Sequence, residues 1–388
     1  MKVPTISRII RAALCVMLCA AVSELRADTD WVVLPVATDS GRTLLHALRD
    51  NSKPVMTDLR FEKGGTVKSL RIGNNKSKFT HAGINAAGVA IVVTGGDPHG
   101  DGTPKKNKFN FDGAKFANNI LAKCTSAEKA VAYIREQANK KLIAASLIVL
   151  VADTNRAFAV ECSPKHFASM EIRSGMCVYA NSWRLPEMDA ASKRAFNDRA
   201  WAVQREWAVR ETLQRARTGN KISVAESIAA SRAGIPELNS KDFEAARKKR
   251  PLNNPPANKY SADGVLFEID REFPGVLSCA YVAFGPARHT VYLPVALGAA
   301  EALPEELKPA PLKNAALARN KAAKPDTPID MRFAAFEKRI FTEFEKSREE
   351  ARTLLRDKKV DDAKKVLQDA LQRHAAEAAA EFGKAAQE

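Results

Sequence analysis

The sequence has few residues of the kinds that build disulfide frameworks or metal sites. Six cysteines occur in 388 residues, and no two of them form a Cys-x-x-Cys pair. Two lie in the N-terminal leader, which leaves Cys124, Cys162, Cys177 and Cys279 far apart in the chain. We expect these four to be buried as small apolar groups, while an oxidising compartment would also permit a disulfide. No metal and no cofactor are expected.

The sequence also lacks a hydrophobic run long enough to span a bilayer stably. Its longest candidate, from Ala12 to Val22, follows Lys2, Arg8 and Arg11 and ends in small residues. This pattern predicts a signal peptide over residues 1–27, and therefore a periplasmic or secreted protein. An uncleaved anchor and a lipoprotein site at Cys19 are the alternatives.

Positive charge is in excess, with a formal net charge of +16 that falls to +13 once the leader is removed. The excess is not accompanied by interleaved aromatics, zinc-ligand spacing or a glycine clamp, so we expect no specific nucleic-acid binding. We expect much of the excess positive charge to lie on solvent-exposed helix faces. Attraction to an anionic wall polymer or membrane surface is the alternative.

The order of elements predicts an α+β fold. Strand-like segments alternate with glycine turns up to about residue 162, long amphipathic helices follow, and further strands lie between Gly264 and Val295. Capping-box patterns at Thr125–Glu128 and Ser223–Glu226 mark two helix starts. We expect one domain over 28–303, a Pro/Ala/Lys linker over 304–330 and a helical hairpin over 331–388.

The predicted hairpin carries one apolar stripe. Its members recur at helical spacing and are Phe333, Phe336, Ile340, Phe344, Leu354, Val366, Leu367, Ala370 and Leu371. We expect the stripe to dock on the main domain. The alternative is a coiled pair that binds a partner or forms a homodimer.

The segment that begins Asp28-Thr29-Asp30-Trp31-Val32-Val33-Leu34-Pro35 and continues without a gap to Asp50 resembles a known family. It is similar to the dipeptidase/secernin group of N-terminal nucleophile (Ntn) hydrolases, whose wider relatives are penicillin acyltransferases and choloylglycine hydrolases. The later segments Gly83–Val89, Ala180–Ser182 and Tyr292–Val295 are similar too. The resemblance implies a four-layer α-β-β-α sandwich.

In such enzymes the first residue of the mature chain is the nucleophile, and its own α-amino group takes the proton. By resemblance, Asp50 would orient that amine. The side-chain amide of Asn181 and the backbone N–H of Gly95 would stabilise the oxyanion.

Two departures from the family pattern decide the functional hypothesis. Asp28 stands where the nucleophilic cysteine is expected (one extra residue would put Ala27 there), and Ala47 stands where relatives carry Arg or Lys. Thr29 is one residue further along a strand, so we expect it to point away from Asp50 and Asn181.

Three residues are candidates for substrate binding: His46, Arg49 and Asn85. We expect His46 and Arg49 to lie on the opposite strand face from Ala47. The segment Asp97–Asp101 is expected to be a turn rather than a metal loop, and His81 and His289 to be structural or surface residues.

The sequence therefore favours an exported Ntn-hydrolase-fold protein, related to amide hydrolases and acyltransferases, that has lost its usual catalysis. It would retain the old cleft as a site for a small amide or peptide ligand. Two alternatives remain: an active amidohydrolase that uses Thr29 or another group, and a protein that acts on a partner through its C-terminal helices.

Overall fold

The computed structural model describes residues 28–50, 57–74, 79–96, 113–192, 196–219, 221–234, 261–307 and 331–385, together with Lys248, Pro256, Leu312, Asn314 and Ala316. The predicted signal peptide (1–27), the Asp97–Asp101 segment and most of the expected linker lie outside these residues. No helix in the described ranges is long and apolar enough to cross a membrane.

Two antiparallel sheets form the centre of the molecule. The described strands of the first sheet run in the order β10 (Met176–Ala180), β1 (Thr29–Val33), β2 (Thr43–Asp50), β11 (Ser261–Ile269), β12 (Cys279–Phe284) and β13 (Tyr292–Ala296). Those of the second run β3 (Thr57–Glu62), β4 (Ser69–Asn74), β5 (Thr80–Asn85), β6 (Ala90–Gly95), β7 (Leu147–Ala152), β8 (Ala157–Cys162) and β9 (Phe167–Glu171). Most strands are buried throughout because both faces of each sheet are covered, whereas the edge strands β3 and β9 are partly exposed.

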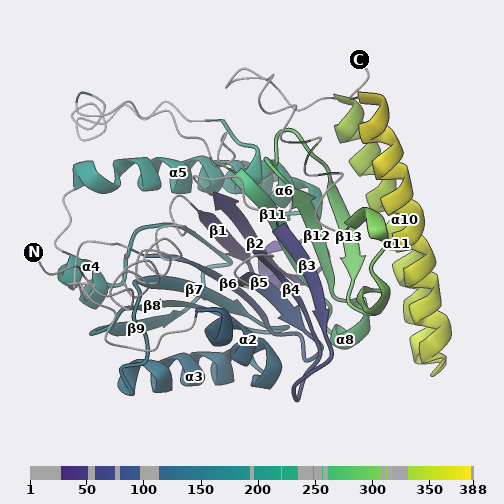
Figure 1. The fold of residues 1–388 in the computed structure, drawn as a ribbon. Coiled ribbons are helices and arrows are strands. Elements are labelled where there is room, and N and C mark those ends of the chain that lie inside the picture. The colour runs from purple at the N-terminus through teal and green to yellow at the C-terminus, as the bar shows by residue number, and fades with distance from the viewer. Residues whose placement is uncertain are drawn as a thin grey trace, which may run out of the picture.

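Helices cover the outer faces of the two sheets (Figure 1). On the second sheet lie α2 (Gly113–Lys123) and α3 (Ala127–Asn139). On the first lie α5 (Phe196–Gly219), α6 (Val224–Ser231), α10 (Met331–Arg356) and α11 (Val360–Ala385). Short helices complete the described elements: α4 (Pro186–Ser192), α8 (Pro274–Leu277), η1 (Pro35–Ala37), η2 (Ala300–Ala302) and η3 (Glu305–Leu307).

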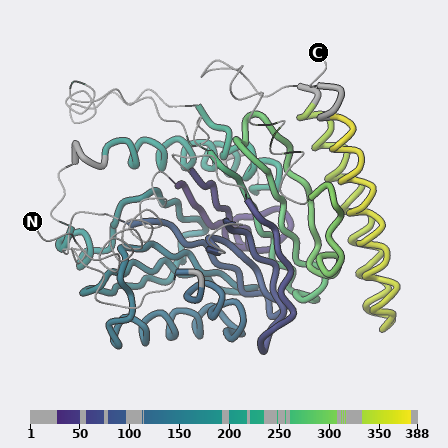
Figure 2. The backbone as a smooth tube through the Cα atoms, in the orientation of Figure 1, coloured from purple at the N-terminus to yellow at the C-terminus, as the bar shows by residue number. Residues whose placement is uncertain are grey.

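The sheets pack face to face through contacts of β1 and β2 with β6 and β7. One apolar cluster fills the space between the sheets and under the helices of the first sheet, and a second lies between the other sheet and α2 and α3. The layers therefore follow the order helix, sheet, sheet, helix, which confirms the expected α-β-β-α sandwich. Figure 2 shows the N-terminal strands, in purple, in the middle of the molecule.

The helix starts agree with the capping patterns, with one shift. Ser223 and Glu226 form the complete capping box at the start of α6, as predicted. At α3 the N-cap is Ser126, whose side chain accepts from Lys129 N, and not Thr125. The predicted box was therefore wrong by one residue, because Asp153 Oδ2 instead accepts from Ala127 N at this helix start.

Replacing Ser223 by alanine is expected to lower the free energy of unfolding by about 1 kcal/mol, because the cap of a buried helix is lost. Ser347→Ala, inside α10, is the matched control and should leave stability unchanged or slightly raised. Chemical denaturation of both variants measures the difference. An equal effect of the two substitutions would contradict a capping role for Ser223.

The C-terminal helices form the predicted hairpin, and it docks on the first sheet. Phe333, Ile340, Phe344 and Leu367 are each at most 1% exposed and belong to the same apolar cluster as the inter-sheet core. The yellow helices lie along β13 in Figure 1. The apolar stripe is thus covered by the protein's own sheet.

Ion pairs join α10 to the end of β11, where the spacing of arginines on the helix matches the spacing of carboxylates on the extended chain. Alternate residues of the extended chain present carboxylates, and arginines one helical turn apart on α10 bind them. The pairs are Arg348–Glu268, Arg352–Asp270 and Arg356–Glu272. Arg348 and Glu268 are at most 2% exposed, so α10 is held by a buried pair as well as by apolar contact.

The four cysteines among the described residues are free thiols in the structure. Cys124, Cys162 and Cys279 are buried and Cys177 is half-buried. The expected burial is confirmed for three of them, and no described pair forms a disulfide.

Candidate functional site

The residues expected at the catalytic centre meet at one end of the sandwich. Antiparallel pairing places the start of β1 beside the ends of β2 and β10, with the start of β11 opposite the end of β2. The end of β6 faces them from the second sheet, because Thr94 contacts Asp28. Asp28, Asp50, Asn181 and Gly95 are therefore brought together, although they are far apart in sequence.

The Asp28 carboxylate is almost fully buried and held by three groups. Its Oδ2 accepts a hydrogen bond of 2.6 Å from Thr94 Oγ1 and lies 3.8 Å from Arg49 Nη1. Its Oδ1 accepts from the backbone N–H of Asp50 at 2.9 Å. The side chain at the expected nucleophile position is thus an acceptor fixed between both sheets.

The Asp50 carboxylate binds a hydroxyl of β11 and a guanidinium of α5. Its Oδ1 accepts from Ser261 Oγ at 2.6 Å, and its Oδ2 lies 3.5 Å from Arg205 Nη1. Asp50 and Arg205 are both fully buried. Such a pair is costly to bury, but removing one partner leaves an uncompensated charge in the interior.

Asn181 is also engaged by its neighbours. Its Nδ2 donates to the carbonyl oxygen of Gly95 at 2.9 Å and to Thr94 Oγ1 at 3.3 Å. Its Oδ1 accepts from Arg205 Nη2 at 2.8 Å. The side-chain amide expected to stabilise an oxyanion is therefore occupied by protein acceptors, and Gly95 contributes its carbonyl oxygen here.

Thr29 lies on the other face of the first sheet from Asn181. It pairs with Leu48 and Ala180, whereas Asn181 and Arg49 follow at the alternate register positions. Asp50 lies two residues beyond Leu48, so strand alternation places it on the Thr29 face. The expectation that Thr29 points away from Asp50 is thus not supported by the register, although no described hydrogen bond joins Thr29 Oγ1 to any residue.

The register also corrects the expectation for Arg49. Residues 47 and 49 are two apart in one strand, so Ala47 and Arg49 share a face, and Arg49 reaches Asp28. Its guanidinium also lies 5.4 Å from the ring centroid of Phe79. Arg49 therefore supplies positive charge to the site from a position two residues after Ala47.

His46 and Asn85 lie apart from this centre. His46 occupies the helix-facing side of β2, stacks on Trp31 at 3.8 Å and lies 3.1 Å from Tyr292 Oη. Burial lowers the pKa of His46 well below its usual value. Asn85 is the last residue of β5, at the opposite end of β6 from Gly95; its Nδ2 donates to Leu121 O and Cys124 O, and its Oδ1 accepts from Val89 N.

Asp30 adds a third buried carboxylate beside Asp28. Burial, and then the neighbouring charge of Asp28, raise the pKa of Asp30 well above its usual value. The guanidinium groups of Arg49 and Arg205 oppose that rise. Opposite charges therefore offset part of the cost of burying this cluster.

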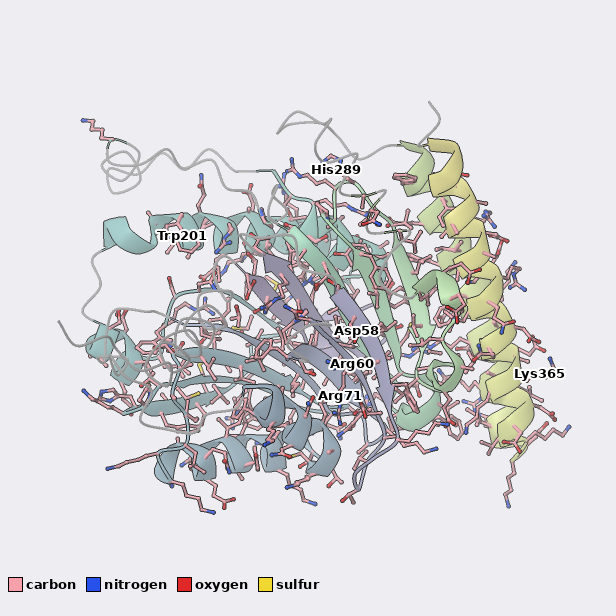
Figure 3. The ribbon with its side chains drawn as sticks, in the orientation of Figure 1. Asp58, Arg60, Arg71, Trp201, His289 and Lys365 are labelled. Carbon is pink, nitrogen blue, oxygen red and sulfur yellow. The ribbon has the colours of Figure 1, made fainter. Side chains whose placement is uncertain are left out.

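Three contributors to the site were missed in the sequence. Arg205 lies on the inner face of α5, between Ala202 and Val209, with its guanidinium over the ring of Trp201. Figure 3 shows Trp201 on this helix. A charged residue within an apolar helical stripe was the available signal. Thr94 and Ser261, polar residues at the ends of apolar strands, gave a weaker one.

A second buried pair joins the sheets near this end. His81 Nε2 lies 2.9 Å from Asp263 Oδ1, and Asp263 Oδ2 accepts from Thr57 Oγ1 at 2.6 Å. His81 is 2% exposed, in agreement with a structural role. Within the described ranges, no three His, Cys, Asp or Glu side chains are grouped to hold a metal ion.

The position of β1 in the sandwich agrees with the expected arrangement. Two stacked antiparallel sheets are enclosed by helical layers, and β1 lies inside the first sheet with its start at the sandwich end that holds Asp50 and Asn181. The described elements thus form the α-β-β-α sandwich that the resemblance implies. No protein-family model and no curated protein matches the sequence.

Solved Ntn hydrolases are similar to this chain at low identity. Penicillin V acylase from Agrobacterium tumefaciens is 15% identical with a TM-score of 0.45, over 69% of this chain and 86% of that chain. A mutant form of conjugated bile acid hydrolase from Clostridium perfringens is 9% identical with a TM-score of 0.45, over 70% and 92%. The Caenorhabditis elegans N-acylethanolamine-hydrolyzing acid amidase ortholog is 9% identical with a TM-score of 0.41, over 64% and 93%.

Proposed function

We propose that this chain is an exported Ntn-hydrolase-fold protein that has lost nucleophilic catalysis and uses the old cleft to bind a small amide or peptide. The observation that carries the proposal is the state of Asp28. A carboxylate at the nucleophile position, held by Thr94 and the Asp50 backbone, is poorly placed to attack an amide. After cleavage at Ala27 it would also pair with its own α-amino group.

The oxyanion donors expected by resemblance support the same conclusion. Asn181 Nδ2 already donates to Gly95 O and Thr94 Oγ1, so an oxyanion would have to displace protein acceptors. Catalysis of this type depends on donors that are in position before charge develops. A site whose donor is engaged is better suited to static binding than to turnover.

Unpartnered donors around the same sandwich end support an oxygen-bearing ligand. Ser146 Oγ, Ser182 Oγ and Trp183 Nε1 are buried and have no hydrogen-bond partner among the described residues. Ser146 and Trp183 both flank Gly96, which directly follows β6. Buried donors gain stability when an acceptor reaches them, and amide or carboxylate oxygens are such acceptors.

The two alternatives are less well supported by the geometry. Thr29 Oγ1 lies on the opposite face from Asn181 and has no hydrogen-bonded base among the described residues. The C-terminal helices bury their apolar stripe against the protein's own first sheet. Neither arrangement resembles a prepared nucleophile or an unoccupied partner surface.

The proposal predicts binding without turnover. The exported protein, incubated with a panel of dipeptides and N-acyl amides, should release no amine or acid above the uncatalysed background. At least one class should raise the melting temperature in proportion to the logarithm of its concentration. Asn181→Asp is the companion variant, since added charge beside Thr94 should weaken that shift. Turnover abolished by Thr29→Ala would overturn the proposal, and so would the absence of a shift with every compound.

A further inference from the structure

A buried carboxylate outside the catalytic positions controls the turn that carries Asn181. Glu161, near the end of β8, is fully buried. Its Oε1 accepts from Tyr179 Oη at 2.9 Å, from Arg184 N at 2.8 Å and from Leu185 N at 3.2 Å. Glu161 belongs to the second sheet, whereas Tyr179 belongs to the first, so this side chain joins the sheets at the strand ends.

The turn held by Glu161 contains two residues, Asn181 and Trp183, that contact the end of β6. Asn181 binds Gly95 and Thr94 at its start, and Trp183 packs against Gly96 so closely that a Cβ there would lie 2.4 Å from Trp183 Nε1. Arg184 and Leu185, at its other end, donate their backbone N–H groups to Glu161. Release of those N–H groups would free the turn on the side away from Asn181.

No ion pair joins Glu161 to a cation within the described ranges. The Arg184 guanidinium instead lies 3.3 Å from Glu206 on α5, donates to Cys177 Sγ on β10 and covers the Tyr179 ring at 3.9 Å. Cys162, the next residue of β8, is buried as well. Burial raises the pKa of Tyr179 and of Cys162, so neither ionises near neutral pH.

We propose that Glu161 is a proton-controlled latch: its protonated form keeps the Asn181 turn closed, and its ionisation favours release of the turn from the cleft. This regulatory role rests on the proposed binding function for its biological meaning. The latch itself is a property of the chain without ligand. It therefore can be tested separately.

The direction follows from linkage between proton binding and conformation. Burial raises the pKa of Glu161 from 4.5 to about 7, against the opposing hydrogen bonds from Arg184 N, Tyr179 and Leu185 N. A released turn exposes the carboxyl to water, where it has an ordinary pKa. The closed state thus binds the proton more tightly, and release becomes roughly 70-fold more favourable between pH 5 and pH 8.

Hydrogen exchange of the Arg184 and Leu185 amides in the full-length protein tests the latch. After correction for intrinsic exchange rates, their protection should fall by tens of fold from pH 5 to pH 8. In Glu161→Gln, which imitates the protonated form, protection should be high and independent of pH. Glu171→Gln, the matched acid-to-amide change on the adjacent strand β9, should retain the wild-type pH dependence.

Two further variants keep the test decisive. Tyr179→Phe removes a hydrogen bond that favours the ionised form, so the midpoint of the protection change should move to higher pH. Burial also raises the pKa of Glu206, and Glu206→Gln examines that neighbour. Protection that is flat in the wild type, or a pH dependence that persists in Glu161→Gln and disappears in Glu206→Gln, would overturn the latch.

Discussion

Replacement of Arg205 by methionine is expected to lower the free energy of unfolding by about 3–5 kcal/mol, because the buried Asp50 carboxylate would lose its ion pair with Arg205. Arg205 is fully buried and also donates to Asn181 Oδ1 at 2.8 Å. Its guanidinium lies 4.6 Å from the Trp201 ring centroid, and that contact would be lost too. Denaturant unfolding at neutral pH measures the loss.

Two companion variants separate charge from packing. Arg215→Met lies on the exposed side of the same helix and should change stability by less than about 0.5 kcal/mol. Arg205→Met combined with Asp50→Asn removes both charges, so it should recover a substantial part of the loss. No recovery in the double variant would show that Arg205 acts through packing, contrary to the ion-pair account.

Replacement of Arg348 by methionine should also cost about 3–5 kcal/mol, since it leaves the buried Glu268 without its nearest cation. Burial alone would raise the pKa of Glu268, but Arg348 and Arg42 together hold it below the usual value. A carboxyl with a lowered pKa stabilises the fold above its unfolded-state pKa, and this contribution is lost as the pH falls through the folded-state value. The Arg348→Met penalty should therefore shrink in acid.

The same substitution tests how the hairpin is attached. Limited proteolysis should cut α10 or α11 of Arg348→Met before it cuts the sandwich, because the pair between α10 and β11 is broken. Arg356→Met, which removes a surface pair with Glu272, is the matched control and should cost at most about 1 kcal/mol. Equal protease resistance and equal stability of the two variants would mean that apolar contacts alone hold α10.

The fold was predictable because its signals are local or shared with a known family. The apolar periodicity of Phe333 to Phe344 indicated a docked helix, and the Trp31–Asp50 pattern indicated the sandwich. The N-cap of α3 was predicted one residue too early, at Thr125 instead of Ser126. The acceptor that binds Ala127 N at this helix start is Asp153, which lies 26 residues away in sequence. The ion pairs between the arginines of α10 and the carboxylates at the end of β11 were not predicted, because they depend on which strand end the hairpin contacts.

The site was predictable only in part. Asp28, Asp50 and Asn181 could be assigned by resemblance, and the structure brings them together. Their actual partners, Thr94, Ser261 and Arg205, come from three separate segments, so only the tertiary structure reveals them. The prediction that Arg49 lies on the opposite face from Ala47 was wrong, because residues two apart in a strand share a face. The contact of Arg49 with Asp28 shows which face this is.

The most direct test is the intact mass of the protein, purified from cells in which the proposed signal peptide can be removed, after incubation with an acylating β-lactone, followed by peptide mapping of its N-terminus. A reactive N-terminal nucleophile would open the lactone ring and remain acylated. The account predicts a mature chain without an adduct on Asp28 or Thr29 under conditions that fully label an active N-terminal cysteine hydrolase. Stoichiometric acylation at the first residue, or at Thr29, would contradict it.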